Sequence, residues 1–315
     1  MMKWWIGGAA ALLLIVIGSW FIVNRPDINM VSPVVKERPL DKYTIENLGK
    51  RGYKSEIILD DAIATTSAYT VYKFHFDSDG KKVTGLAHMP SKCPCPAIVQ
   101  FRGYVERDIY QPGVGTKRTA EVFAKNGFIS LAPDFLGYGG SDNPPNDVFE
   151  ERFLTYVTGL NLLAGIEKWE RAGKIGIWGH SNGGQIALTV LEISQKKYPT
   201  VLWAPVSKPF PYSILYYTDE ADDRGKALRK KLAEFEKDYD VELYSLTNYQ
   251  DRIKAPVSIH QGTADDAVPK KWTDELVKNL KAEYVEYAGA DHNFQPGTNW
   301  GKAVERTVEF FKNNI

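Results

Sequence analysis

Short apolar runs alternate with amphipathic stretches over the last two thirds of the chain. The apolar runs suit buried strands and lie at residues 96–101, 128–132, 175–178, 200–203, 256–260 and 283–287. The stretches between them carry apolar residues at helical spacing, at residues 117–126, 150–172, 185–195, 270–280 and 300–312. Strands that alternate with helices predict an α/β fold with a mostly parallel sheet and helices on both faces.

The part of the chain before this region has a different pattern. Residues 56–59, 69–76 and 82–88 read as strands that follow one another without helices between them. The last two flank the sequence Asp77-Ser78-Asp79-Gly80, whose residue types favour a tight turn. An antiparallel hairpin is therefore expected at the start of the sheet.

One segment is too long to be a plain connection between elements. Residues 204–254 carry an aromatic run and then a charged stretch that predicts a helix over about 223–239. We expect a cap insertion at about 205–254, after the sixth strand, over the carboxyl edge of the sheet, where α/β proteins bind ligands. A surface excursion held by aromatic packing is the alternative interpretation. The candidate substrate-binding residues of this segment are Tyr212, Tyr216 and Tyr217.

The first residues suggest a membrane segment. Residues 4–23 carry no charge and are numerous enough to cross the ~30 Å hydrocarbon core of a bilayer. We expect residues 1–23 to be a retained membrane anchor, with a cleaved signal peptide as the alternative. Residues 24–42, with three prolines, then form a linker, and residues 43–315 form the main domain, which we expect on the extracytoplasmic side.

Composition and charge narrow the possible partners. The 315 residues, 43% of them hydrophobic, can bury the core of one large domain. The 39 basic and 39 acidic residues balance, so no net field is available to hold a polyanion, and nucleic acid is not an expected partner. Cys93 and Cys95 are too close for an unstrained mutual disulfide and lack the Cys or His partners of a zinc site. We therefore expect them to be a feature of a loop.

The most informative motif is Gly179-His180-Ser181-Asn182-Gly183-Gly184. It follows the strand at 175–178 and precedes the helix that begins near Gln185, which is the strand, turn and helix context of a G-x-S-x-G nucleophile elbow. The glycines give room where a Cβ would collide in so sharp a turn. Ser181 is then exposed at the tip, and the Asn182 N–H, at a helix start, points to where an attacked carbonyl oxygen becomes negative.

A serine nucleophile needs a neighbouring base, and the choice of histidine is narrow. His75 and His88 lie on the hairpin strands, His180 is inside the turn, and His260 is within a strand. His292 remains. It lies in a loop after the last strand and before the last helix, so it should hang over the carboxyl edge of the sheet.

The acid that orients the histidine should follow the strand at 256–260. Asp265 and Asp266 are both available there, and either could instead cap the helix that begins near Pro269. The loop after the strand at 96–101 should supply the second oxyanion donor, for which the Tyr104 N–H is the best candidate.

Arg102 in that loop either binds a carboxylate of the substrate or pairs with a structural acid. The glycines between Pro133 and Asp142 lack the spacing of a strand-GxGxxG-helix site, so a dinucleotide is not expected. No metal or organic cofactor is implied by the motifs.

From about Val83 to the C-terminus the chain resembles the α/β-hydrolase superfamily, and within it the catalytic domain of the prolyl oligopeptidase family of serine peptidases. The stretch Gly179 to Gly184 is similar to the family's G-x-S-x-G-G, and Gly262 to Pro269 is similar to G-x-x-D-x-x-V-P, with Asp265 at the place of the acid. Asp291-His292-Asn293-Phe294 is similar to the histidine loop. The resemblance thus favours Asp265 over Asp266.

What the resemblance implies is a serine hydrolase that forms an acyl-enzyme through Ser181, Asp265 and His292 and cleaves peptide bonds. Two departures matter. Phe101-Arg102-Gly103 stands where the family usually has His-Gly-Gly, and we expect no room upstream for the β-propeller of larger members. A carboxylesterase of the same superfamily, acting on a small molecule, is therefore the alternative, followed by a binding protein without turnover.

Overall fold

The computed structural model describes residues 36–218 and 221–315. Contacts divide the chain into Met1–Arg38 and Pro39–Ile315. The anchor predicted over residues 4–23 lies outside the described residues and stays a prediction. Within the described ranges no helix has the length and apolar character needed to cross a membrane.

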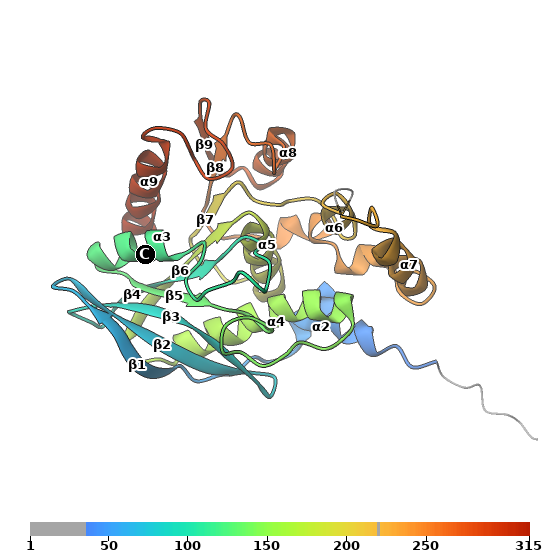
Figure 1. Cartoon of the computed structure of the whole chain (residues 1–315), viewed down its shortest axis with the longest axis horizontal. Coiled ribbons are helices and arrows are strands. Elements are labelled where there is room, and N and C mark those ends of the chain that lie inside the picture. Colours follow the sequence, from blue (N-terminus) through green and yellow to red (C-terminus); the bar gives the residue numbers. More distant parts are fainter. Residues whose placement is uncertain (1–35, 219–220) are drawn as a thin grey trace, which may run out of the picture. The chain divides into compact units, whose positions relative to one another are not determined.

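The second unit is built on one nine-stranded sheet with the order β1-β2-β3-β5-β4-β6-β7-β8-β9. Strands β1 to β3 and β5 pair antiparallel, and β4 to β9 pair parallel (Figure 1). The strands are β1 Ile58–Thr65, β2 Tyr69–Ser78, β3 Lys81–Pro90, β4 Cys95–Phe101, β5 Ile129–Pro133, β6 Ala172–His180, β7 Thr200–Trp203, β8 Val257–Gly262 and β9 Glu283–Tyr287. The mostly parallel sheet that begins with an antiparallel hairpin is confirmed.

The turn of that hairpin explains its register. The Gly80 N–H donates to the Asp77 carboxylate at 3.0 Å, and Gly80 has a φ of 81°, which glycine adopts without strain. Strands β2 and β3 then pair without interruption from Ser78↔Lys81 to Tyr69↔Pro90.

Helices cover both faces of the sheet. The α-helices are α2 Ile45–Lys50, α3 Lys117–Lys125, α4 Val148–Glu167, α5 Asn182–Ser194, α6 Tyr212–Leu215, α7 Lys226–Phe235, α8 Lys270–Leu280 and α9 Asn299–Asn314, and the 3-10 helices are η1 Pro39–Tyr43, η2 Val241–Tyr244, η3 Leu246–Asn248 and η4 Gln250–Arg252. Because successive strand residues point to opposite faces, Ile98 packs with α3 and α9 while Ala97 and Val99 pack with α4 and α5.

The insertion between β7 and β8 holds α6, α7 and the 3-10 helices η2 to η4. It follows the seventh strand, β7, and not the sixth as predicted, although the expected strands up to residues 200–203 are themselves seven in number. Phe210 and Phe235 of the insertion pack on Phe149 and Phe153 of α4, with ring centroids 5.1–6.4 Å apart. Figure 1 shows α6 and α7 together beside α4 and α5.

The compact unit begins at Pro39, within the segment predicted as a linker. Leu40 and Tyr43 of η1 are buried, and the Tyr244 hydroxyl donates to the Leu40 carbonyl at 3.2 Å. The last residues before 43 therefore pack against the insertion.

Cys93 and Cys95 form a disulfide, which corrects the expectation from the sequence. The two Cα atoms lie 4.7 Å apart, on either side of Pro94.

Candidate active site

The carboxyl ends of the parallel strands meet at one edge of the sheet. The register pairs Phe101 of β4 with Gly179 of β6, His180 with Trp203 of β7, and Trp203 with His260 of β8. Loops that leave β4, β6 and β8 therefore start side by side. Each of these loops carries one part of the predicted site.

The turn between β6 and α5 has the geometry of a nucleophile elbow. Ser181 has φ 55° and ψ −120°, a strained combination for a residue with a Cβ. Its N–H donates to the Trp203 carbonyl at 2.9 Å, and its carbonyl accepts from Gly184 and Val206 at 2.9 and 3.0 Å. These backbone hydrogen bonds keep Ser181 in its strained conformation. Within residues 36–218 and 221–315, Ser181 Oγ makes no hydrogen bond and lines a cavity.

Glycine is required on both sides of this serine. A Cβ on Gly183 would lie 1.9 Å from the Phe101 carbonyl oxygen, and a Cβ on Gly179 would lie 2.6 Å from the Gly183 carbonyl oxygen. Both contacts are with backbone, which cannot move aside. The elbow is thus packed directly on the end of β4.

Asp265 and His292 lie together. His292 Nδ1 donates to Asp265 Oδ2 at 2.9 Å and to Oδ1 at 3.1 Å. This bond fixes the tautomer in which Nε2 is free to take a proton. The Asp265 side chain has no exposed area, whereas Asp266, the alternative acid, is exposed.

The loop after β8 holds the Asp265 carboxylate from several sides. Oδ1 accepts from the N–H groups of Ala267 and Val268 at 3.0 and 2.8 Å, and Oδ2 accepts from Gln261 Nε2 at 2.9 Å. Burial by itself raises the pKa of Asp265, but the hydrogen bonds and charge of His292 and these donors outweigh it, so the pKa is lowered. Asp265 is therefore an anion at neutral pH.

Gln261 is a positioning residue that the sequence patterns did not indicate. It is fully buried, and its Oε1 accepts from the Thr273 hydroxyl at 2.7 Å while its amide reaches Asp265. A glutamine inside a strand has no motif of its own. Its role depends on α8, which supplies Thr273.

His180 supports the histidine loop. Its Nε2 donates to the His292 carbonyl at 3.0 Å, and the two rings lie 4.7 Å apart between centroids. Burial, and then the charge of His292, lower the pKa of His180 to about 4, so it is neutral at pH 7. The sequence assigned His180 to the turn alone. Contacts with a loop 112 positions away give it this second role.

The loop after β4 approaches the serine closely. A Cβ on Gly103 would lie 3.2 Å from Ser181 Cβ, so Gly103 lets the loop pass beside the nucleophile. Tyr104 and Asn182, the predicted oxyanion donors, line the same cavity as Ser181. The Tyr104 side chain is exposed, which leaves its backbone as the part relevant to an oxyanion.

Arg102 is placed inside the protein rather than in that cavity. Its guanidinium donates to the carbonyls of Gly103 and Asp134 at 2.9 and 3.1 Å and lies over the rings of Tyr110 and Tyr138. Of the two roles open to it from the sequence, these contacts fit the structural one. It holds the loop of Tyr104 in place.

The predicted tyrosines of the insertion separate into two groups. Tyr217 lines the cavity at Ser181, and its hydroxyl donates to the Ala267 carbonyl at 3.2 Å in the loop of the acid. Tyr212 and Tyr216 instead pack on Trp272 of α8, with centroids 5.9 and 4.6 Å away. Only Tyr217 therefore faces the nucleophile.

The cavity at Ser181 has a volume of about 510 Å³. It is bounded by the oxyanion loop, α4, the elbow and the insertion. Its lining residues that the sequence did not single out are Glu106, Arg152, Val206, Ser213, Ile214, Thr218 and Ala221. Elsewhere among the described residues, no group of three His, Cys, Asp or Glu side chains could hold a metal ion.

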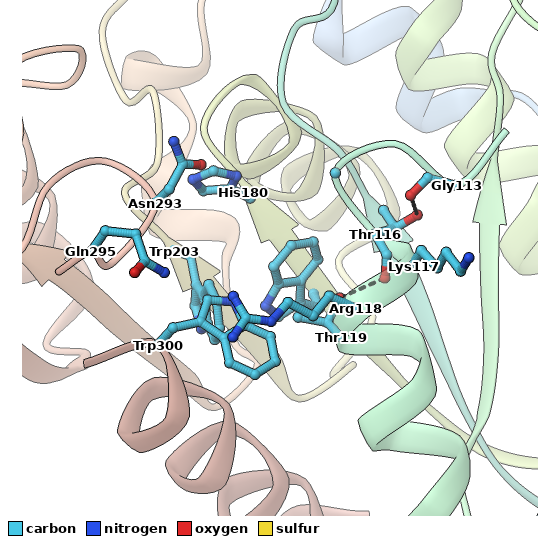
Figure 2. A pocket seen from close by; sticks show the side chains of 12 residues that line it. Gly113, Thr116, Lys117, Arg118, Thr119, His180, Trp203, Asn293, Gln295 and Trp300 are labelled. Carbon is cyan, nitrogen blue, oxygen red and sulfur yellow. Dashed lines mark hydrogen bonds between the residues drawn. The ribbon is translucent and has the colours of Figure 1, made fainter. Parts of the chain in front are cut away.

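A second cavity of about 330 Å³ lies beside His180, between the start of α3 and the loop of Asn293. Figure 2 shows His180 and Asn293 together on one side and Thr116 to Thr119 on the other. The Arg118 guanidinium covers the ring of Trp300 at 3.5 Å from its centroid. This cavity does not include Ser181 among its lining residues.

The sheet order, the strained serine at the tip of a strand-turn-helix junction, and the Asp265–His292 pair define an α/β-hydrolase. The family model of the prolyl oligopeptidase family, Peptidase_S9, matches residues 115–315, and the chain belongs to this family. It is accordingly an enzyme of the serine hydrolase class. No curated protein matches the chain.

Several solved structures share the fold at low identity. Acetyl xylan esterase 1 from Thermoanaerobacterium sp. JW/SL YS485 has a TM-score of 0.64 and 16% identity, over 86% of this chain and 93% of its own. An S-formylglutathione hydrolase from Agrobacterium tumefaciens has a TM-score of 0.55 and 17% identity, over 82% and 98%. A puromycin-hydrolysing peptidase from Mycobacterium tuberculosis has a TM-score of 0.59 and 17% identity, over 80% of this chain and 41% of its own.

Proposed function

We propose that this enzyme hydrolyses carboxylic esters with a small acyl group through an acyl-enzyme. Ser181 Oγ attacks the ester carbonyl, His292 takes the serine proton and gives it to the leaving alcohol, and Asp265 orients His292. The N–H groups of Asn182 and Tyr104 hold the oxyanion. The observation that carries the proposal is the Asp265–His292 pair at 2.9 Å, bonded through the His292 carbonyl to His180, the residue before the elbow serine that lines a cavity.

In the resting site the serine and histidine need not be hydrogen-bonded, because such bonds often tighten only when substrate is present. A water molecule then attacks the acyl-enzyme with His292 as base, so one water is consumed and the acid and the alcohol are released.

Two observations favour an ester over a peptide. The cavity of about 510 Å³ is walled by the insertion, which suits a small acyl group better than an extended chain. Several esterases are also among the solved structures that share the fold, including the acetyl xylan esterase with a TM-score of 0.64. Hydrolysis of short peptides is the second candidate, and the family model is the observation that favours it.

The first test is labelling of the purified protein with a fluorophosphonate, followed by mass spectrometry of the modified peptide. We expect a single adduct on Ser181 and none in Ser181→Ala, whose turnover should fall by several orders of magnitude with its fold intact. Turnover of an ester and an amide with the same acyl group then compares the two candidates. A folded protein that is neither labelled nor active would contradict the proposal.

A further inference from the structure

Among residues 36–218 and 221–315, one cation that lines the active-site cavity, Arg152, has no counterion. Arg152 lies on α4, whose residues are mostly buried and apolar, and its side chain lines the cavity together with Ser181. The inference that follows rests on the proposed function, because it concerns the acyl group that this cavity would hold.

Within the described part of the chain, the hydrogen bond that Arg152 donates goes to a neutral group. Its Nη2 donates to Gln185 Oε1, and Gln185 Nε2 in turn donates to the Ser213 hydroxyl at 3.2 Å. Its Nε is buried without a partner. Over residues 36–218 and 221–315, no carboxylate forms an ion pair with it.

The neighbouring positions show that this is a particular feature of Arg152. Glu151, one residue earlier on α4, forms an ion pair with Arg107 on the outside of the protein. Arg152 is equally half-buried and lines a cavity with Glu151 as well as the cavity of Ser181, but it forms no ion pair with a described residue. Removing water from a guanidinium costs free energy when no anion replaces the water. A ligand that brings an anion to the guanidinium offsets this cost when it binds.

We propose that Arg152 selects substrates whose acyl group carries its own carboxylate, such as half-esters of short dicarboxylic acids. The guanidinium can donate to a carboxylate from Nη1, which is not buried and has no partner among the described residues, while Gln185 holds Nη2 and keeps the side chain in place. The ester carbonyl lies at Ser181 and the free carboxylate lies at Arg152. Hydrolysis consumes one water and releases the alcohol and the dicarboxylic acid.

Glu106 provides an internal comparison, since it lines the same cavity with the opposite charge. It is exposed, so solvent screens its repulsion of an anionic substrate. Removing the charge of Glu106 should therefore act weakly and in the opposite direction to removing the charge of Arg152.

The experiment measures kcat/KM of the full chain for glutarate half-esters and for valerate esters of the same alcohol. These two acyl groups have the same number of carbons and differ by the terminal carboxylate. We expect Arg152→Gln to lower the ratio of glutarate to valerate turnover about 10- to 100-fold, as the loss of a charge-assisted hydrogen bond predicts. Arg152→Lys should restore part of the ratio, and Glu106→Gln should leave it equal or higher.

A structural role for Arg152 would lower both activities and leave the ratio in place, and that result would overturn the inference. Succinate and adipate half-esters extend the comparison to shorter and longer acyl groups. If Arg152→Gln lowers the ratio of half-ester to uncharged ester turnover at none of the three acyl lengths, the inference is contradicted as well.

A binding measurement separates this inference from the proposed function. We expect calorimetry to detect glutarate binding to Ser181→Ala and its loss when Arg152→Gln is added. Binding of this kind without ester turnover by the wild-type enzyme would reject the proposed function and keep the anion site. If the wild-type enzyme hydrolyses valerate esters and Arg152→Gln leaves glutarate binding unchanged, the proposed function is supported and the anion site is rejected.

Discussion

Adjacent residues of the same type have different surroundings at the acid loop. Asp265 accepts hydrogen bonds from His292, Gln261 and two backbone N–H groups, and its side chain is fully buried. Asp266 is exposed to solvent. The charge of Asp265 therefore acts on one imidazole, whereas the charge of Asp266 is screened by water.

Asp265→Asn should reduce kcat by about 10³- to 10⁴-fold, because an amide favours the wrong tautomer of His292. Asp266→Asn is the matched control and should keep kcat within about twofold. Steady-state hydrolysis of one ester by the three proteins checks this. Equal losses in the two variants would show that the pair of Asp265 and His292 is not the one that acts.

At the scale of elements, the site depends on how closely α5 and β4 approach each other. The elbow brings Gly183 against the Phe101 carbonyl oxygen, with no space for a methyl group. The insertion closes the cavity from the opposite side, where Tyr217 joins it to the acid loop. The nucleophile is thus placed by contacts among three segments that are far apart in sequence.

Gly183→Ala should destabilise the protein by about 2–4 kcal/mol, because a Cβ there overlaps backbone that must then shift. Fluorophosphonate labelling of Ser181 should fall with it. Gly301→Ala in α9 meets no atom within 4 Å and should instead stabilise by up to about 1 kcal/mol through helix propensity. Urea unfolding of both variants measures the difference, and equal effects would contradict the close approach.

At the scale of the whole molecule, several ionisable groups are buried in the form that carries no charge. Burial lowers the pKa of His88 and His180 to about 4 and that of His260 to about 3. Burial also raises the pKa of Glu192 well above its ordinary value, and both carboxyl oxygens of Glu192 lack a hydrogen bond. Stability should therefore depend on pH through the interior as well as the surface.

His260 illustrates the sign on the acid side. Below the ordinary histidine pKa of about 6.5, the unfolded chain binds a proton that the native protein excludes down to about pH 3. The free energy of unfolding should fall by about 1.4 kcal/mol per pH unit for this residue as the pH drops through that window. In His260→Gln the free energy of unfolding should fall less steeply with decreasing pH, by about 1.4 kcal/mol per pH unit. Urea unfolding from pH 7 to pH 5 measures this difference in slope.

Glu192→Gln is the control of opposite sign. With a raised native pKa, Glu192 contributes stability below pH 4.5 that is lost as the pH rises toward the native value. The stability of Glu192→Gln relative to the wild type should therefore increase with pH above 4.5. If both variants keep the slope of the wild type, then these two groups titrate alike in the native and unfolded states.

The sequence by itself determined the fold class and predicted Ser181 as the nucleophile. Hydrophobic periodicity is a local property that separates buried strands from amphipathic helices, and the strand, glycine turn and helix around Ser181 is a local motif. The position of His292 after the last strand followed from chain order. These features needed no knowledge of which distant residues meet.

Tertiary structure alone decided the features that depend on distant partners. It gave His180 and Gln261 supporting contacts around the Asp265–His292 pair, and it brought Arg152 of α4 into the cavity, where no described carboxylate pairs with it. Such properties arise from packing between elements, and a pattern read along one chain does not contain the distances that packing creates.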